Sequence, residues 1–231
     1  MKSRGRMEFK KLSWISLVLV LACNSSDPDP IIESYFPLDI GFYQIYQVEE
    51  TRYLAFQPPQ NYSYQLRSKI LDRFTNTSGG TTHVIQRNIR PDEFADWEIS
   101  ETWSVRTENP YIIVNEGNEP FVRLVTSPAK NLSWNGNMYN SLEPDDYLIT
   151  ESGIEFTTDD GLTFNDCVVV VQEDESNLVN KDERIEVYSP GKGLVFKESK
   201  VWNYNCSGGT CTDQIVSGYY LKMTLIESGQ E

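Results

Sequence analysis

Apolar and polar residues alternate over much of the chain. In residues 62–74, for example, Tyr62, Tyr64 and Leu66 are separated by single polar residues. A period of two is typical of a β-strand with one buried face. Similar alternating, β-branched or aromatic runs cover residues 42–56, 82–90, 97–106, 111–115, 121–126, 147–158, 162–172, 184–188, 193–204 and 218–227. The pattern predicts strands from one end of the chain to the other.

Turn-forming residues separate these runs. Residues 76–80, 116–120 and 159–161 combine Gly with Asn, Asp or Pro, which favours tight connections. No apolar pattern holds helical spacing for three turns, and only residues 92–96 and 139–142 could form one-turn helices. The sequence therefore predicts an all-β fold of about ten to eleven antiparallel strands, as one curved sheet, a barrel or a sandwich.

Residues 1–22 have the three parts of a secretory signal. The start is basic, and residues 12–21 form an apolar run that is too short to span a bilayer of roughly 30 Å. It ends in Val-Leu-Ala-Cys, which resembles a lipobox, so we expect cleavage before Cys23 and lipidation of its thiol. An ordinary signal peptide with an incidental Cys, or a short membrane anchor, is the alternative.

Residues 23–34 are polar and contain Pro, which predicts a lipidated Cys followed by a flexible tether. Residues 35–231 are then left as a single β domain. Asn24 replaces the Asp that often retains lipoproteins in the inner membrane, and the acidic stretch 25–29 resembles a surface-export signal of Bacteroidota lipoproteins. We expect an outer-membrane lipoprotein, held to the membrane through Cys23, on the periplasmic or the cell-surface face.

The charge of the chain narrows the choice of partners. Without residues 1–22, which hold five basic residues and one acidic residue, 15 basic and 33 acidic residues remain, a net charge of −18. Such a surface repels phosphate backbones, which argues against nucleic-acid binding.

The cysteines other than Cys23 favour structural roles. Cys206 and Cys211 enclose Ser-Gly-Gly-Thr, and a disulfide closing this loop is expected in an oxidising compartment. A metal site is the alternative, but His83 is the only histidine and no further Cys pair exists. Cys167 lies in a β-branched run and is expected to be a buried, inert thiol. Two acidic turns lack the alternating ligands of a calcium loop, so no cofactor is expected.

No motif specifies a reaction. His83 has no Gly-x-Ser-x-Gly partner motif, so a Ser-His-Asp arrangement is unsupported, and we do not expect an enzyme. Paired carboxylates could serve a polymer hydrolase, but spacing does not choose among the candidates. These are Glu98, Glu101, Asp145, Asp146 and Glu155.

The aromatic residues offer two further readings. Trp134, Asn135 and Asn137 suggest a buried indole beside a turn whose amides cap backbone groups, or alternatively a sugar site with Trp134 as a stacking platform. The 13 Tyr, 10 Phe and five Trp either fill one face of the sheet or line a cavity for an apolar ligand.

Several stretches together resemble a family of Bacteroidota lipoproteins without an assigned activity. The resemblance rests on an aromatic-Pro-Leu-x-x-Gly start, Trp-Asn-Gly-Asn in the middle and a late Tyr-x-Pro-Gly-x-Gly-Leu-Val. They lie in residues 35–46, 134–137 and 188–195, accompanied by 161–164, 217–220 and 225–229. The resemblance implies a single strongly curved antiparallel sheet of half-barrel type, with at most one-turn helices.

These observations lead to one expectation and two alternatives. We expect a monomeric, membrane-anchored, non-catalytic binding or envelope-assembly module, whose partner is an apolar ligand or an envelope protein. The first alternative is a carrier of a lipid or other apolar ligand on the concave face of the sheet. The second is the polymer hydrolase.

Overall fold

The structure, a computed structural model, describes residues 34–231. These residues belong to one compact unit of the chain, Ile32–Glu231, and form 12 strands and no helix. The predicted signal sequence, Cys23 and the tether before residue 34 lie outside the described residues. Among those described, no helix could cross a membrane.

The strands follow one another along the chain with short connections. They are β1 (Phe42–Tyr53), β2 (Gln60–Thr75), β3 (Thr81–Arg90), β4 (Glu98–Glu108), β5 (Tyr111–Glu116), β6 (Glu119–Val125), β7 (Ser133–Asn135), β8 (Asp146–Thr157), β9 (Thr163–Ser176), β10 (Asn180–Ser189), β11 (Gly193–Ser207) and β12 (Thr210–Gln230).

The all-β prediction is confirmed, with one strand more than the sequence indicated. The additional strand is β7, whose three residues are too few to show an alternating pattern. The two segments that could have formed one-turn helices, residues 92–96 and 139–142, are turns. The carboxylate of Asp92 accepts a hydrogen bond from the backbone N–H of Phe94. The side-chain oxygen of Asn140 likewise accepts one from the backbone N–H of Leu142. Such side-chain bonds compete with helix formation.

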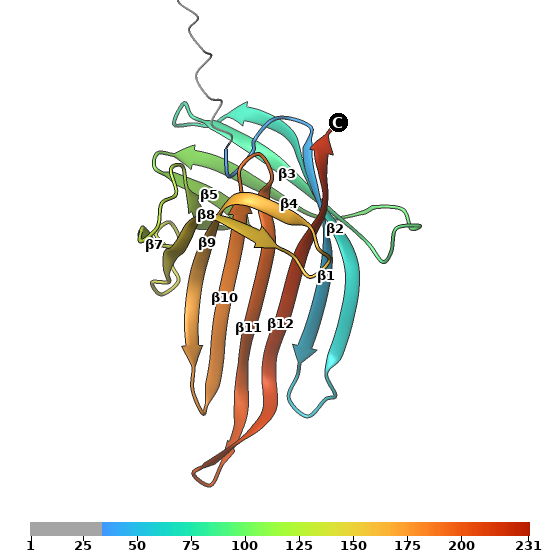
Figure 1. Cartoon of the computed structure of the whole chain (residues 1–231), viewed down its shortest axis with the longest axis vertical. Helices are drawn as coiled ribbons and strands as arrows, with labels where there is room; N and C mark the ends of the chain where they lie inside the picture. Colours follow the sequence, from blue (N-terminus) through green and yellow to red (C-terminus); the bar gives the residue numbers. More distant parts are fainter. Residues whose placement is uncertain (1–33) are drawn as a thin grey trace, which may run out of the picture. The chain divides into compact units, whose positions relative to one another are not determined.

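All 12 strands form a single antiparallel sheet in the order β6-β5-β4-β3-β2-β1-β12-β11-β10-β9-β8-β7. The first strand therefore pairs with the last, from Phe42 opposite Gln230 to Tyr53 opposite Gly218. Figure 1 shows the sheet curling until its two edges, β6 and β7, approach each other, while β10 to β12, β1 and β2 extend further as a tall curved wall.

Hydrogen bonds bridge the two edges and nearly close the sheet into a barrel. The backbone N–H of Val122 on β6 donates to the carbonyl of Gly136, just after β7, at 2.8 Å. The indole of Trp134 on β7 returns a bond to the carbonyl of Val122 at 2.9 Å. Gly136 permits this approach, because a Cβ there would lie 2.4 Å from the ring of Tyr147. Both edges are thus covered, which removes a template for strand pairing between chains.

Two hydrophobic clusters stabilise the sheet. The first fills the closed part of the barrel with residues of β2 to β10, and the second includes residues of the β8–β9 hairpin. On β9, Val168 and Val170 belong to the first cluster, whereas Cys167 and Val169 belong to the second. The strand is buried on both sides, which explains its unbroken apolar run in the sequence.

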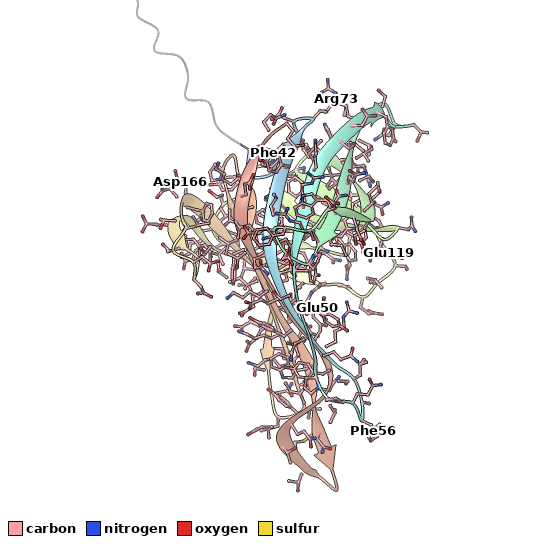
Figure 2. The ribbon with its side chains drawn as sticks, turned by 90° about the vertical axis from the view of Figure 1, so that its right-hand side faces the viewer. Phe42, Glu50, Phe56, Arg73, Glu119 and Asp166 are labelled. Atoms are coloured by element: carbon pink, nitrogen blue, oxygen red, sulfur yellow. A yellow bond between two sulfur atoms is a disulfide. The ribbon has the colours of Figure 1, made fainter. Side chains whose placement is uncertain are left out.

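The β8–β9 hairpin covers β11 and β12 from outside the barrel. Phe156 of the hairpin packs on Phe196 of β11 with ring centroids 5.4 Å apart. The turn of the hairpin reaches β12, where Lys222 forms an ion pair with Asp159. Figure 2 shows the β1–β2 turn, marked by Phe56, at the far end of the long strands from Phe42 and Asp166.

The hydrogen bond from the Trp134 indole to the carbonyl of Val122 allows the closure of the barrel to be tested. We expect Trp134→Phe to lower the free energy of unfolding by about 1–3 kcal/mol, because the carbonyl of Val122 loses its donor. Trp202→Phe is the matched control, since its indole nitrogen is buried without a partner among the described residues. Urea unfolding of both variants measures the difference. Equal losses would argue that the edge bond contributes nothing.

Candidate functional site

The barrel encloses a cavity of about 110 Å³. Its wall is built from β1 to β6, β10 to β12 and the segment before β1, and most of its residues are apolar or aromatic. The lining residues are Phe36, Pro37, Phe42, Gln44, Tyr46, Leu66, Ser68, Ile70, Ile85, Arg87, Trp103, Val114, Glu116, Arg123, Glu186, Tyr188, Gly193, Leu194, Lys197 and Met223.

Two of the sequence motifs meet at this cavity. The aromatic-Pro-Leu start supplies Phe36 and Pro37, and the late Gly-x-Gly-Leu turn supplies Gly193 and Leu194. The amide of Gln44 holds this turn by donating to the carbonyls of Lys192 at 2.7 Å and Leu194 at 3.0 Å. Gly193 has a φ of +74°, and a Cβ there would lie 2.9 Å from the Gln44 amide. The glycine therefore lets the turn approach β1 closely.

Five charged side chains also face the cavity: Arg87, Glu116, Arg123, Glu186 and Lys197. Arg123 and Glu116 form a two-bond ion pair with N–O distances of 2.7 and 2.8 Å. Burial by itself would lower the pKa of Arg123, but the carboxylate of Glu116 raises it. In this pair each side chain therefore neutralises the charge of the other and is bound by two parallel hydrogen bonds.

Glu186 is the most deeply buried of the five, with 2% of its surface exposed. Its carboxylate accepts bonds from Lys197 Nζ at 2.7 Å and from the Tyr188 hydroxyl at 2.6 Å. Burial opposes ionisation, but the charges of Lys197 and Arg123 outweigh it and lower the pKa of Glu186 to about 2. Burial and the neighbouring carboxylate raise the pKa of Tyr188. Glu186 is thus a carboxylate, and Tyr188 a neutral donor, at neutral pH.

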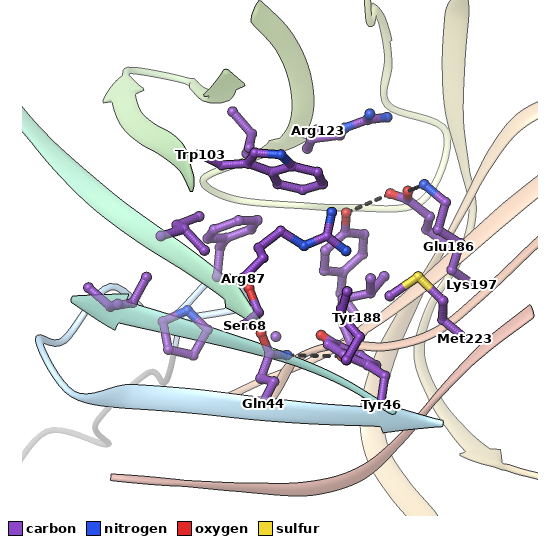
Figure 3. Close-up of a pocket in the computed structure, with 18 of the residues that line it drawn as sticks. Gln44, Tyr46, Ser68, Arg87, Trp103, Arg123, Glu186, Tyr188, Lys197 and Met223 are labelled. Carbon is purple, nitrogen blue, oxygen red and sulfur yellow. Dashed lines mark hydrogen bonds and ion pairs between the residues drawn. The ribbon is translucent and has the colours of Figure 1, made fainter. Parts of the chain in front are cut away.

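Arg87 is less fully paired than the other cations of the cavity. Its guanidinium stacks on the indole of Trp103 with Cζ 3.7 Å from the ring centroid. Its Nη1 donates to Glu101 at 3.3 Å, and the side chain of Glu101 is 52% exposed. Burial lowers the pKa of Arg87 in spite of Glu101 and Glu116. Figure 3 shows the guanidinium below Trp103, near the centre of the cavity.

Two grooves continue from the cavity. One, of about 680 Å³, lies along β1 to β4 and shares Leu66 and Arg87 with the cavity. The other, of about 310 Å³, shares Arg123 and Lys197. The residues supplied by the two motifs line neither groove. We call the part of the cavity that the motif residues line, which borders neither groove, the closed end, and the part where Arg87, Arg123 and Lys197 border the grooves the mouth.

The second groove contains a further unmatched donor. The side-chain amide nitrogen of Gln172 is buried and has no hydrogen-bond partner among the described residues. Nearby, Arg184 forms a two-bond ion pair with Asp145 at 2.8 and 3.1 Å. A buried unpaired donor is costly, so this groove suits a ligand or ordered water that accepts a hydrogen bond.

The Trp-Asn-Gly-Asn motif lies outside this cavity and supports the fold. Trp134 is 5% exposed and meets the ring of Tyr147 edge-on, so its faces are not open to a sugar. The side-chain oxygen Oδ1 of Asn135 accepts hydrogen bonds from the backbone N–H groups of Asn137 and Asp145 at 2.9 and 3.0 Å. Asn137 in turn donates to the carbonyl of Glu143. The indole of Trp134 is thus buried beside a turn whose backbone groups bond to side-chain amides.

The candidate carboxylates lie in different parts of the structure. Glu98 and Glu101 border the larger groove, and Asp145 is paired with Arg184 in the smaller one. Asp146 and Glu155 are exposed residues of β8 and line neither groove. Within residues 34–231, no group of three or more His, Cys, Asp and Glu side chains could hold a metal ion.

The cysteines and the histidine have structural surroundings. The Sγ atoms of Cys206 and Cys211 form a disulfide at the β11–β12 turn. Cys167 is a buried free cysteine, and burial raises the pKa of its thiol, which suppresses its reactivity. His83 lies on β3, and burial lowers the pKa of its imidazole.

Sequence reasoning missed the charged cavity residues. Glu186 lies between Ile185 and Val187, so alternation alone places it on a solvent face. In the structure the hairpin cluster contacts Ile185 and Val187, and Glu186 faces the interior. Glu186 and Lys197 are direct partners across β10 and β11 and carry opposite charges. This pairing would have indicated the charged interior, but recognising it requires the register of the two strands.

No protein-family model and no curated protein sequence matches the chain. Among solved structures, it is similar to a protein described as exported, with a YmcC-like fold, from Bacteroides fragilis. That match has 13% identity and a TM-score of 0.48 and covers 86% of this chain and all of the other. A protein described as a lipoprotein from Parabacteroides distasonis has 15% identity and a TM-score of 0.43, covering 86% and 99%. At TM-scores below 0.5, neither neighbour carries an argument about function.

The Glu186 ion pair gives a pH-dependent prediction. We expect Glu186→Gln to lower the free energy of unfolding at pH 7 by about 3 kcal/mol, since it leaves the partly buried Lys197 without its counter-charge. The stabilisation from this carboxylate is present above the unfolded pKa of 4.5 and is lost as the pH falls toward about 2. The difference in the free energy of unfolding between Glu186→Gln and the wild type should therefore decrease below pH 4.5.

Urea unfolding between pH 7 and pH 3 measures this gap. Glu198→Gln is the matched control, because Glu198 pairs with Lys200 at 2.6 Å in a more exposed position. Its loss should stay below about 1 kcal/mol. A Glu186→Gln gap that is constant over the whole pH range would contradict the ionised, buried carboxylate.

Proposed function

We propose that this protein is a non-catalytic binding protein whose ligand enters the barrel cavity from the two grooves. The observation that carries the proposal is the cavity itself. It combines apolar walls with a few placed charged groups, beside the packed core of the barrel. Small-molecule sites typically have this combination of apolar walls and a few placed polar groups.

The state of the cavity carboxylates supports binding rather than hydrolysis. A glycosidase needs one protonated and one free carboxyl group on either side of the scissile bond. Glu186 is ionised and bound to Lys197, and Glu116 is held by Arg123. Both carboxyl groups are therefore occupied by cationic partners rather than arranged around a substrate as an acid and a base.

The proposed location rests on the N-terminal sequence. The basic start, the short apolar run and the Val-Leu-Ala-Cys sequence favour a lipid anchor on Cys23, and Asn24 favours the outer membrane. The polar segment 24–34 would then connect the anchor to the β domain. In this arrangement the protein would present its ligand site to the extracytoplasmic space.

A variant that fills the cavity tests the binding proposal. Ser68 lines the cavity directly opposite Arg87, so Ser68→Leu adds apolar volume to it. We expect native mass spectrometry of the full chain, released from bacterial membranes, to show a non-covalent adduct that is lost on denaturation. Overpacking costs of 1–3 kcal/mol predict that Ser68→Leu lowers adduct occupancy by about tenfold or more.

Thr107→Leu is the control for this experiment, because Thr107 is exposed on β4 and lines neither the cavity nor the grooves. Its adduct should equal that of the wild type. An adduct that survives Ser68→Leu unchanged would place the ligand elsewhere, and a wild type without any adduct would favour a filled-core interaction module.

Removal of the lipidation site tests the anchor. We expect Cys23→Ala to leave the chain without the diacylglycerol mass, because the thiol that carries the lipid is removed. Intact-mass measurement of the wild type and the variant from a Gram-negative host provides the readout. A wild-type chain that keeps residues 1–22 and carries no diacylglycerol would support the short-anchor alternative instead.

A further inference from the structure

We infer that the cavity selects an organic anion whose apolar end fills the closed end and whose carboxylate binds Arg87 at the mouth. This inference rests on the proposed binding function and names the chemistry of its ligand. It follows from the charge balance of the cavity, the surroundings of Arg87 and the order of apolar and charged residues along the wall.

The charge balance leaves one cation over. The cavity wall carries three cations and two carboxylates, and both carboxylates are already held, Glu116 by Arg123 and Glu186 by Lys197. Arg87 remains, and its acceptor Glu101 does not line the cavity. An anion in the cavity would therefore meet a positive charge that only the exposed Glu101 compensates, and charge pairing is strong at a largely buried group.

Arg87 is oriented for such an anion. A guanidinium has five N–H donors, and among the described residues those of Arg87 have one acceptor, at 3.3 Å. The stacking on Trp103 covers one face of the guanidinium and limits its rotation. The donors at its edge face the cavity (Figure 3), where a carboxylate could accept two parallel hydrogen bonds.

The order of residues determines which end of the ligand enters first. Phe36, Pro37 and Leu194 line the cavity but neither groove, whereas Arg87 lines both the cavity and the larger groove. The apolar end of a ligand therefore passes Arg87 and leaves its head group beside the guanidinium. A cavity of about 150 Å³ holds a benzene ring, so the volume here of about 110 Å³ suits a short chain of about five carbons.

Other ligand classes fit the same wall less well. A cationic amphiphile would face Arg87 with no free carboxylate to bind it, and like charges repel strongly in such surroundings. A neutral chain would fill the apolar end but would exclude water from Arg87 without replacing the lost hydrogen bonds. The observations therefore favour the anion over both.

Three matched six-carbon probes test the inference: hexanoate, 1-hexanol and hexylammonium. Calorimetric titration uses the full chain held in an amphipathic polymer, so that no free detergent competes. We expect hexanoate to bind at least about tenfold more tightly than hexanol, as charge-assisted hydrogen bonds imply, and hexylammonium not to bind. Arg87→Gln should weaken hexanoate about tenfold or more and leave hexanol within about twofold.

Arg67→Gln is the matched control variant. Arg67 is also partly buried and lies over a tryptophan ring, at 5.1 Å from Trp97, but it does not line the cavity. It should leave hexanoate binding unchanged. If Arg87→Gln fails to fold, the titration of bound ¹³C-labelled hexanoate can still be measured on the wild type alone. The carboxyl carbon of ¹³C-labelled hexanoate should titrate about one pH unit or more lower when bound beside an arginine than when free.

The outcomes separate the two proposals. Equal binding of hexanoate and hexanol, with no effect of Arg87→Gln and no shift in the titration of the carboxyl carbon, overturns the anion inference and leaves the binding function standing. Preferential binding of hexylammonium overturns the inference as well. Failure of all three probes to bind overturns the proposed binding function together with the inference.

Discussion

The pairing of the first strand with the last is the constraint on which the rest of this structure depends. Because β1 and β12 are neighbours, both described chain ends lie in the middle of the sheet, and its edges come from the middle of the sequence. Those edges, β6 and β7, meet through the bonds between Val122, Gly136 and Trp134. The cavity is the part of this enclosed space that side chains leave empty. Closure therefore protects the sheet edges and creates the candidate site together.

The charged residues in the barrel show how the protein reconciles burial with ionisation. A buried ion pair recovers its desolvation cost only with good geometry and further hydrogen bonds. Glu186 has both, from Lys197 and Tyr188, and Arg123 has two bonds to Glu116. Arg87 relies on stacking and one long bond. The chain as a whole has an excess of acidic residues, whereas the cavity wall has one more cation than carboxylates. This contrast is a reason to regard the cavity as a binding site rather than a packing defect.

Much of the fold was predictable because alternation and turn chemistry act over short distances. They identified every strand except β7, whose three residues carry no period, and limited any helix to one turn near Asp92 and Asn140, where capped turns form instead. The apolar run of β9 predicted a strand but not the hairpin that covers its second face. That covering depends on the β8–β9 hairpin reaching β11 and β12, which short-range patterns do not encode.

The sequence by itself determined the all-β class, the positions of most strands, the cysteine-bounded turn and the motifs at residues 35–46 and 188–195. Only the tertiary structure brought these two motifs together at one cavity and turned Arg87 and Glu186 inward. The physical reason is that alternation sorts residues onto two faces without saying which face becomes enclosed. That choice depends on strand register, on the pairing of β1 with β12 and on closure between β6 and β7, all of which join residues far apart in the chain.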